Sequence, residues 1–141
     1  MAHMHQSTAS LRIIGDTLKP EEITQLLGCA PTRSHIKGQE WQGKKTGKTY
    51  IKDFGLWALK ANDCEPENLD EQVNWLLSQL TPDLHIWASI REKYRMDLFC
   101  GFFMEETNES VSISPKTLLA LGERGISLGL DIYAPTPEEE S

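Results

Sequence analysis

The sequence is poor in cysteine and has no two cysteines close together. Cys29, Cys64 and Cys100 are far apart, whereas zinc sites and disulfide frameworks use closely spaced cysteines. We therefore expect three reduced thiols in a cytoplasmic protein. Beyond the first five residues only His35 and His85 are histidines, and neither lies in a metal-binding spacing. We expect no metal and no cofactor.

Long apolar runs and catalytic motifs are absent as well. No run approaches the ~20 apolar residues of a transmembrane helix, and the N-terminus lacks the apolar segment of a signal peptide. We thus expect no contact with membranes. No Gly-x-Ser-x-Gly motif marks a hydrolase nucleophile, and we assign no catalytic residue. The segment 43–49 resembles a phosphate-binding loop, but it has three residues between its glycines where that motif has four.

What the sequence has in excess is acid. Its 141 residues, enough for one domain, carry 21 acids and 14 bases, a net charge of −7. This balance argues against a nucleic-acid partner, which usually needs a basic surface. The charge is uneven, because residues 33–52 contain six bases and one acid, or +5, which leaves −12 for the rest.

The hydrophobic pattern predicts an α+β fold in the order β-α-β-α-β-β-β-α-β. The expected strands are residues 11–14, 54–59, 84–90, 96–102, 111–113 and 127–133, and the expected helices are 20–27, 69–80 and 115–122. Long alternating strands favour a mainly antiparallel or mixed sheet with three helices mostly on one face, a two-layer sandwich.

The expected domain spans residues 10–133. Residues 1–9 resemble a cloning remnant or a disordered N-terminus, and residues 134–141 are predicted to be a disordered acidic tail. Residues 29–53 show no sustained period and are interpreted as a long loop or a ragged hairpin.

Two surfaces are candidate binding sites. In the expected strand 84–90, His85 and Trp87 alternate with aliphatic residues, which would place them, with Arg91, on the outer face of the sheet. Aromatic and charged residues on an open face are typical of an interface, although the 29–53 segment could instead cover this face.

The second surface is the basic 29–53 segment, whose aromatics lie among its bases. Such residues could hold phosphates and stack bases, dock an acidic protein, or form a solvated loop whose aromatics pack on the sheet. The candidate partner- or anion-binding residues of both surfaces are Arg33, Lys37, Trp41, Lys44, Lys45, Lys48, Tyr50, His85, Trp87 and Arg91.

The order of several short motifs carries a resemblance. These are Leu27-Gly28-Cys29-Ala30-Pro31-Thr32 after a proline-started helix, Lys37-Gly38, Gly55-Leu56-Trp57, and Leu130-Asp131-Ile132-Tyr133. Together they resemble the bacterial domain of unknown function family 4279 over about residues 10–133. The resemblance implies a small stand-alone bacterial α/β domain, and it brings no activity, cofactor or catalytic residue.

These observations lead to competing functional hypotheses. The first is a non-enzymatic protein-binding module, in one version an immunity protein that neutralises a toxin. The alternative is a binder of, or an enzyme acting on, a small anionic or phosphorylated ligand at the basic 33–52 segment. A third is a homodimer formed through the outer sheet face and Trp87.

Overall fold

The computed structural model describes residues 2–3 and 5–135. Its elements are, in order, β1 (Ala2–His3), β2 (Gln6–Gly15), α1 (Pro20–Leu27), β3 (Arg33–His35), β4 (Glu40–Gln42), β5 (Thr49–Ile51), β6 (Gly55–Lys60), α2 (Leu69–Ser78), α3 (Leu84–Lys93), β7 (Arg95–Phe103), β8 (Glu109–Ser110), α4 (Pro115–Arg124) and β9 (Ser127–Tyr133). None of the helices in this described part is long and apolar enough to cross a membrane.

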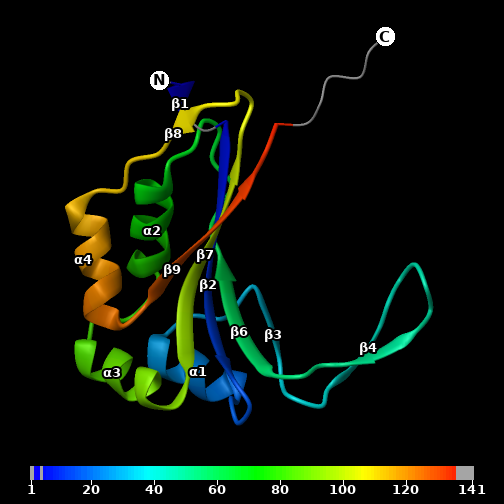
Figure 1. The fold of residues 1–141 in the computed structure, drawn as a ribbon. Coiled ribbons are helices and arrows are strands. Elements are labelled where there is room, and N and C mark those ends of the chain that lie inside the picture. Colours follow the sequence, from blue (N-terminus) through cyan, green and yellow to red (C-terminus); the bar gives the residue numbers. More distant parts are fainter. Residues whose placement is uncertain (1, 4, 136–141) are drawn as a thin grey trace.

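A mixed five-stranded sheet organises the fold (Figure 1). The strand order is β3-β6-β2-β7-β9, and every neighbouring pair is antiparallel except β7 and β9, which run parallel. The predicted α+β class with a mixed sheet is therefore confirmed. Parallel neighbouring strands need a crossover connection. Helix α4 is part of that connection, because it lies between β7 and β9 in the chain.

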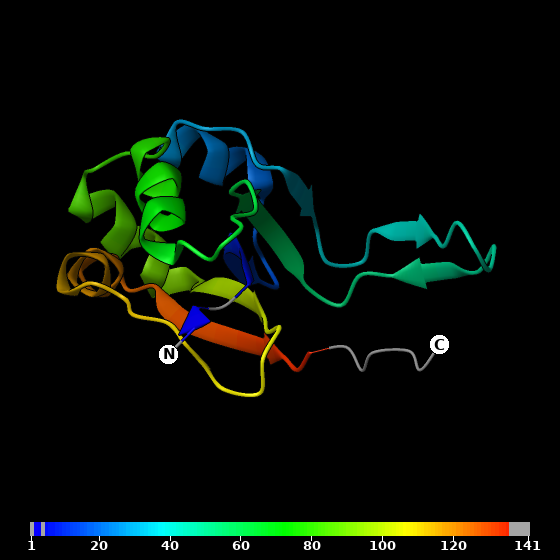
Figure 2. The ribbon, with the colours of Figure 1, turned by 90° about the horizontal axis from the view of Figure 1, so that it is seen from above.

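The helices cover one face of the sheet and leave the other open (Figures 1 and 2). Alternate residues of the central strand β2 enter the core, namely Ala9, Leu11 and Ile13, each at most 1% exposed. All four helices contribute to the same core, with α1 supplying Ile23 and α2 supplying Leu76, for example. The two-layer arrangement follows, because each helix buries one apolar stripe against the apolar face of the sheet.

Capping residues mark the ends of the helices. Asn68 begins α2 and its side chain accepts a hydrogen bond from the N–H of Glu71, while Ser114 caps α4 in the same way. Gly28 ends α1 at φ 79° and Gly125 ends α4 at φ 74°. Glycine suits these left-handed positions because it has no Cβ to clash.

The expected strand 84–90 is wrong, because this segment belongs to helix α3. The side chain of Asp83 accepts from the N–H of His85 and so starts the helix, and Trp87 and Ile90 are buried one turn apart. The described residues thus form four helices rather than three. The helix ends at Lys93, and Tyr94 follows it as the C-cap residue. The strand expected at 111–113 also differs, since β8 lies just before it and pairs with β1.

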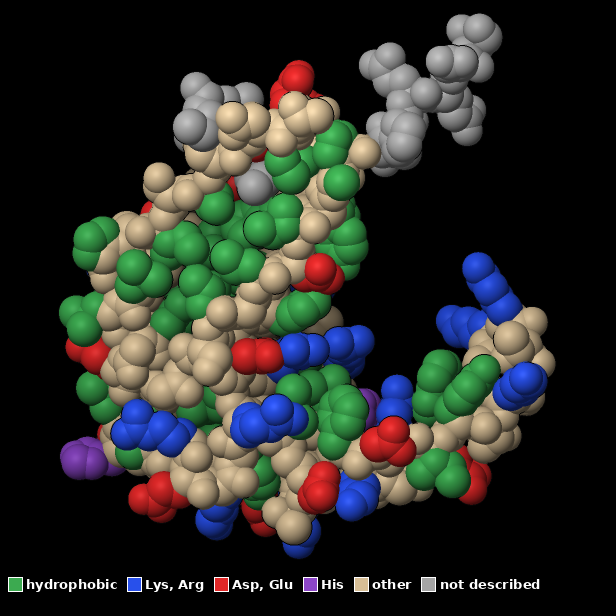
Figure 3. Space-filling view, viewed as in Figure 1, with side chains coloured by type: hydrophobic (Ala, Val, Ile, Leu, Met, Phe, Trp, Pro, Cys, Tyr) green, Lys and Arg blue, Asp and Glu red, His purple; other side chains and the backbone are tan. Residues whose placement is uncertain are grey.

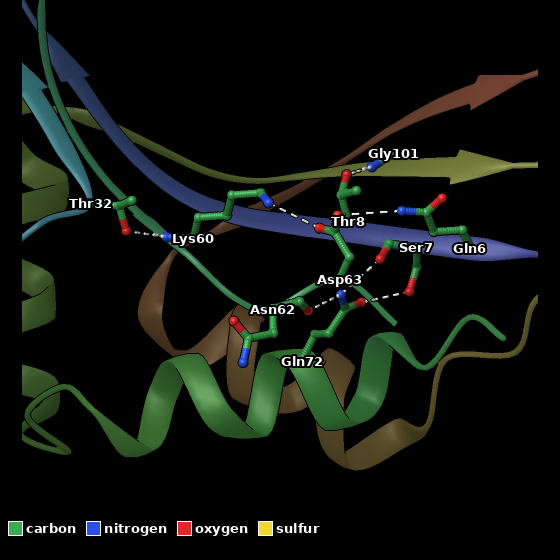
Figure 4. A network of polar contacts seen from close by, with 9 residues as sticks. All are labelled: Gln6, Ser7, Thr8, Thr32, Lys60, Asn62, Asp63, Gln72 and Gly101. Atoms are coloured by element: carbon green, nitrogen blue, oxygen red, sulfur yellow. Dashed lines mark hydrogen bonds and ion pairs between the residues drawn. The ribbon is translucent and has the colours of Figure 1, made fainter. Parts of the chain in front are cut away.

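Strand β2 begins at Gln6, before the predicted domain start at residue 10. The small residues Ser7 and Ala9 continue its inward alternation, and both are 0% exposed. Ser7 is tied to α2 by Gln72, whose amide donates to the carbonyl oxygens of Ser7 and Asn62 at 2.9 Å each (Figure 4). Of the predicted acidic tail, residues 136–141 lie outside the described part.

The segment predicted as a loop or ragged hairpin divides into two parts. Its first part, β3, adds an edge strand to the sheet beside β6. Its second part is the β4–β5 hairpin, which projects from the open side of the sheet and does not lie over its centre (Figures 1 and 2). The open face is consequently bordered by the hairpin rather than covered by it.

Candidate anion-binding cleft

The open face of the sheet carries charged and aromatic side chains. Because paired residues of antiparallel strands share a face, Arg12 and Asp97 lie side by side on β2 and β7. Arg33 and His35 share this face with Ala58 and Leu56, their partners on β6.

A cleft of about 340 Å³ lies where the hairpin leaves the open face. Its lining residues are Arg12, Arg33, Ser34, His35, Gln39, Lys52, Phe54 and Leu56. Three of these are cationic and none is a carboxylate. Lysine and arginine side chains line the hollow between the body and the hairpin (Figure 3). A concave site lined by one sign of charge concentrates the field and attracts the opposite sign.

Arg12 is held rigidly at the inner side of the cleft. Its guanidinium makes two hydrogen bonds to the carboxylate of Asp97, at 2.8 and 2.7 Å, and lies 4.5 Å from the ring centre of Phe99. The hydrogen bonds to Asp97 raise the pKa of Arg12. The carboxylate of Asp97 already neutralises the charge of Arg12. Arg12 therefore offers the cleft a hydrogen-bond donor in a fixed position rather than a free positive charge.

His35 and Arg33 reach the cleft from the edge strand β3. The His35 ring lies 5.4 Å from that of Phe54, centre to centre. Burial, and then the positive charges of Lys52 and Arg33, lower the pKa of His35 below its ordinary 6.5. The imidazole is therefore neutral at pH 7. Arg33 is exposed and makes no ion pair with any described residue.

Lys52 is placed by the base of the hairpin. Its N–H donates to the carbonyl of Gln39 at 2.9 Å, and its carbonyl accepts from Gly38 at 2.8 Å. Its ammonium lies 4.4 Å from the ring centre of Trp41, which stacks on Tyr50 with ring centres 4.9 Å apart. These contacts stiffen the hairpin and hold the half-buried Lys52 at the cleft, where it has no carboxylate partner among the described residues.

Among the candidate residues of the basic segment, the structure brings only some together. Arg33 lines the cleft, and Trp41 and Tyr50 form the arm beside it. Lys37 instead pairs with Asp16 at 3.3 Å on the surface. The remaining lysines of the set lie in the turn at the hairpin tip, where all are exposed: Lys44, Lys45 and Lys48.

The candidate surface of His85, Trp87 and Arg91 does not exist as predicted. Trp87 is 0% exposed, and its indole N–H donates to the carbonyl of Thr81 at 2.8 Å, so it is a core residue and cannot contact a partner. His85 and Arg91 are exposed, but they lie on helix α3 and not on the sheet. The physical reason is the helical period of this segment, which buries residues 87 and 90 together.

Sequence reasoning missed Arg12, His35 and Lys52 as parts of one site. Arg12 interrupts the apolar run 11–14, which indicates an outward-facing charge on a strand. Nothing local links it to Lys52, because the cleft forms only after β3 and β6 pair and the hairpin folds back.

Two larger hollows lie at the end of the sheet near α3. One, of about 420 Å³, has Asp16 and Glu92 among its lining residues, and the other, of about 360 Å³, has Asp97. Mixed charge makes both weaker anion sites than the cleft. Within the described residues no group of three or more His, Cys, Asp or Glu side chains could hold a metal ion, and all three cysteines are free thiols.

Comparison with known proteins identifies the family and nothing finer. Neither the curated proteins nor the solved structures include a significant match to the chain. A family profile, described as a domain of unknown function (DUF4279), matches residues 5–135, which include every element of the sheet and all four helices. The chain belongs to this family.

Proposed function

We propose that the protein is a binding module that holds an acidic segment of a partner protein in the cleft between the open sheet face and the hairpin. The observation that carries this proposal is the lining of the cleft, which has three cations and no carboxylate. In a chain of net charge −7, such a region is a local exception.

The three cationic lining residues have different parts in this binding. Arg33 and Lys52 have no carboxylate partner in the part of the chain that the structure describes, and they supply the attraction. Arg12 offers a preorganised donor next to its pair with Asp97. Guanidinium groups bind carboxylates through two parallel hydrogen bonds, which gives direction as well as energy. The exposed Trp41 and Tyr50 extend the contact along the hairpin.

A protein partner is favoured over a small ligand by the shape of the site. The cleft continues onto the exposed arm of the hairpin (Figure 3), so an extended segment could contact both. A toxin-neutralising immunity protein is one version of this proposal, and it requires that the acidic segment belong to the toxin.

A small anionic ligand is the second candidate. The observation in its favour is the cleft volume of about 340 Å³, which falls at the low end of the ~300–1,000 Å³ typical of small-molecule sites. Both candidates rely on the same cations, so they are separated by the size of the anion.

The test is isothermal titration with an oligoglutamate peptide and, separately, with inorganic phosphate. We expect the peptide to bind and phosphate to bind far more weakly. Comparable binding of phosphate would favour the small ligand instead. No heat from either probe would refute the proposal.

Paired variants locate the site. Arg33→Gln with Lys52→Gln should weaken peptide binding by at least about tenfold, since a charge-assisted hydrogen bond contributes about 1.5–3 kcal/mol. Lys44→Gln with Lys45→Gln removes the same net charge from the hairpin tip and should change binding by less than about threefold. Equal losses in the two variants would mean that charge alone, and not the cleft, attracts the peptide.

A further inference from the structure

The free edge of the sheet at β9 is open to pairing with another strand. β9 is the last strand of the order and pairs only with β7 among the described strands. Natural edge strands are usually protected by lysine, proline, a bulge or short length. β9 has seven residues, one charge and no proline. The opposite edge, β3, has three residues and begins with Arg33.

The backbone groups of β9 that face outward belong to its apolar residues. The carbonyl of Tyr133 accepts from the N–H of Met104, so it points toward β7. Backbone groups alternate in direction along a strand, and those of Leu128, Leu130 and Ile132 therefore point away from the sheet, unpaired. The residues of β9 whose backbone groups are free to pair are thus the same residues that carry apolar side chains.

The side chains beside this edge form an exposed apolar surface. Leu130 and Ile132 are 45% and 50% exposed, and Leu118 and Leu119 on the adjoining α4 are 49% and 61% exposed. Apolar side chains gather over α4 and β9 on this side of the molecule (Figure 3). A continuous patch of this kind marks an interaction surface.

We propose that a second copy of this chain covers the edge, with the two β9 strands antiparallel about a twofold axis at Leu130. In this register Leu130 pairs with Leu130 of the second copy, and Leu128 pairs with Ile132. Every outward backbone group of these residues then meets its complement, as in an isologous interface. Asp131 lies opposite Gly129, so the two aspartates do not face each other directly.

Charge complementarity also favours a second copy. The antiparallel register places Tyr133 of one copy opposite Ser127 of the other, beside a hollow whose charged lining residues are Arg91, Arg95 and Asp97. Asp97 is already paired with Arg12, which leaves the two arginines as the unpaired charges of this hollow. Neither arginine makes an ion pair with a described residue. Glu138, Glu139 and Glu140 follow Tyr133 in the sequence. The register therefore brings the strand end that leads into an acidic segment to the side of the second copy that carries the two arginines.

The first test is sedimentation of the full chain at micromolar concentration. We expect twice the 16.0 kDa mass of one chain. Leu130→Arg should give a monomer with an unchanged circular dichroism spectrum. Leu26→Arg, at a leucine of similar exposure (40%) on α1, is the matched control and should remain dimeric. A wild-type monomer, or a dimer that survives Leu130→Arg, would overturn the proposal.

Hydrogen exchange tests the register without any variant. On dilution of the wild-type protein, the amides of Leu128, Leu130 and Ile132 should exchange faster. Those of Gly129 and Asp131, which face β7, should not change. Protection independent of concentration would also overturn the proposal. Because the cleft lies at the far side of the sheet, dimerisation leaves it accessible.

Discussion

Replacement of Gln72 by Met should strongly destabilise the protein, although it preserves the size of the side chain. Gln72 lies on α2 and is 2% exposed. Its amide N–H₂ donates to the carbonyls of Ser7 and Asn62 at 2.9 Å, and its oxygen accepts from the Ser7 hydroxyl at 2.7 Å. Methionine can make none of these bonds, so buried polar groups on β2 and before α2 lose a partner.

The magnitude follows from the number of bonds. Each net hydrogen bond contributes about 1 kcal/mol, so the loss of three predicts a decrease of about 2–3 kcal/mol in the free energy of unfolding, allowing for the apolar gain of methionine. For a domain of this size that corresponds to a fall in Tm of about 10 °C. In the variant Ser7 keeps one side-chain hydrogen bond, because its hydroxyl still accepts from the N–H of Asn68 at 3.1 Å.

Urea denaturation monitored by tryptophan fluorescence measures this change. Gln79→Met is the matched control, because Gln79 is exposed at the end of the same helix. Within the described residues its side chain bonds only to the exposed Ser78. The control should stay within about 0.5 kcal/mol of the wild type. If Gln72→Met were equally harmless, the claim that this buried network stabilises the packing of α2 on β2 would be refuted.

Three further predictions concern titratable groups. Folding lowers the pKa of His35, so just below pH 6.5 the unfolded chain binds more protons than the folded one. The urea midpoint should therefore decrease as the pH is lowered through that window, and it should decrease less in His35→Gln. An equal pH dependence in the two proteins would contradict the lowered pKa of His35. Burial, and then the nearby Asp97, raise the pKa of the Cys100 thiol to about 12. Iodoacetamide should therefore leave Cys100 unmodified in the native protein while it labels the partly exposed Cys29. Equal labelling of the two cysteines by mass spectrometry would refute this prediction. Asp97→Asn removes the charge that neutralises Arg12 and should strengthen oligoglutamate binding several-fold in titration; weaker binding would show that the carboxylate chiefly positions Arg12.

The helix ends and the apolar periods were the most readable parts of the sequence. Asn68 and Ser114 act locally, through hydrogen bonds to residues three positions away, and so their roles can be predicted without the fold. The alternation in 96–102 also predicts β7 correctly, because the two faces of this strand differ in polarity.

The segment 84–93 shows why the same reasoning fails elsewhere. Its aliphatic residues happen to alternate, and Leu84 is nevertheless 42% exposed. The buried residues are Trp87 and Ile90, which are three positions apart, as on one face of a helix. Asp83 after Pro82 was the better signal, because it is typical of a helix N-cap. Tertiary packing overrode the apparent period.

The cleft was not predictable as a unit, for a different reason. Its residues come from β2, β3 and the base of the hairpin, and Lys52 is placed by hydrogen bonds to Gln39 and Gly38. Charge counting shows that the segment is basic, but it could not separate Arg33 and Lys52 from the lysines at the exposed tip. Strand pairing makes that distinction.

The most direct test of the proposed function is a map of backbone amide shifts by NMR during titration with the oligoglutamate peptide. Binding in the cleft predicts the largest shifts at Arg12, at 33–35 and at 52–56, with small shifts at the hairpin tip and on the helix side. Shifts confined to residues 44–48, or spread over the helices, would contradict the central claim that the cleft is the binding site.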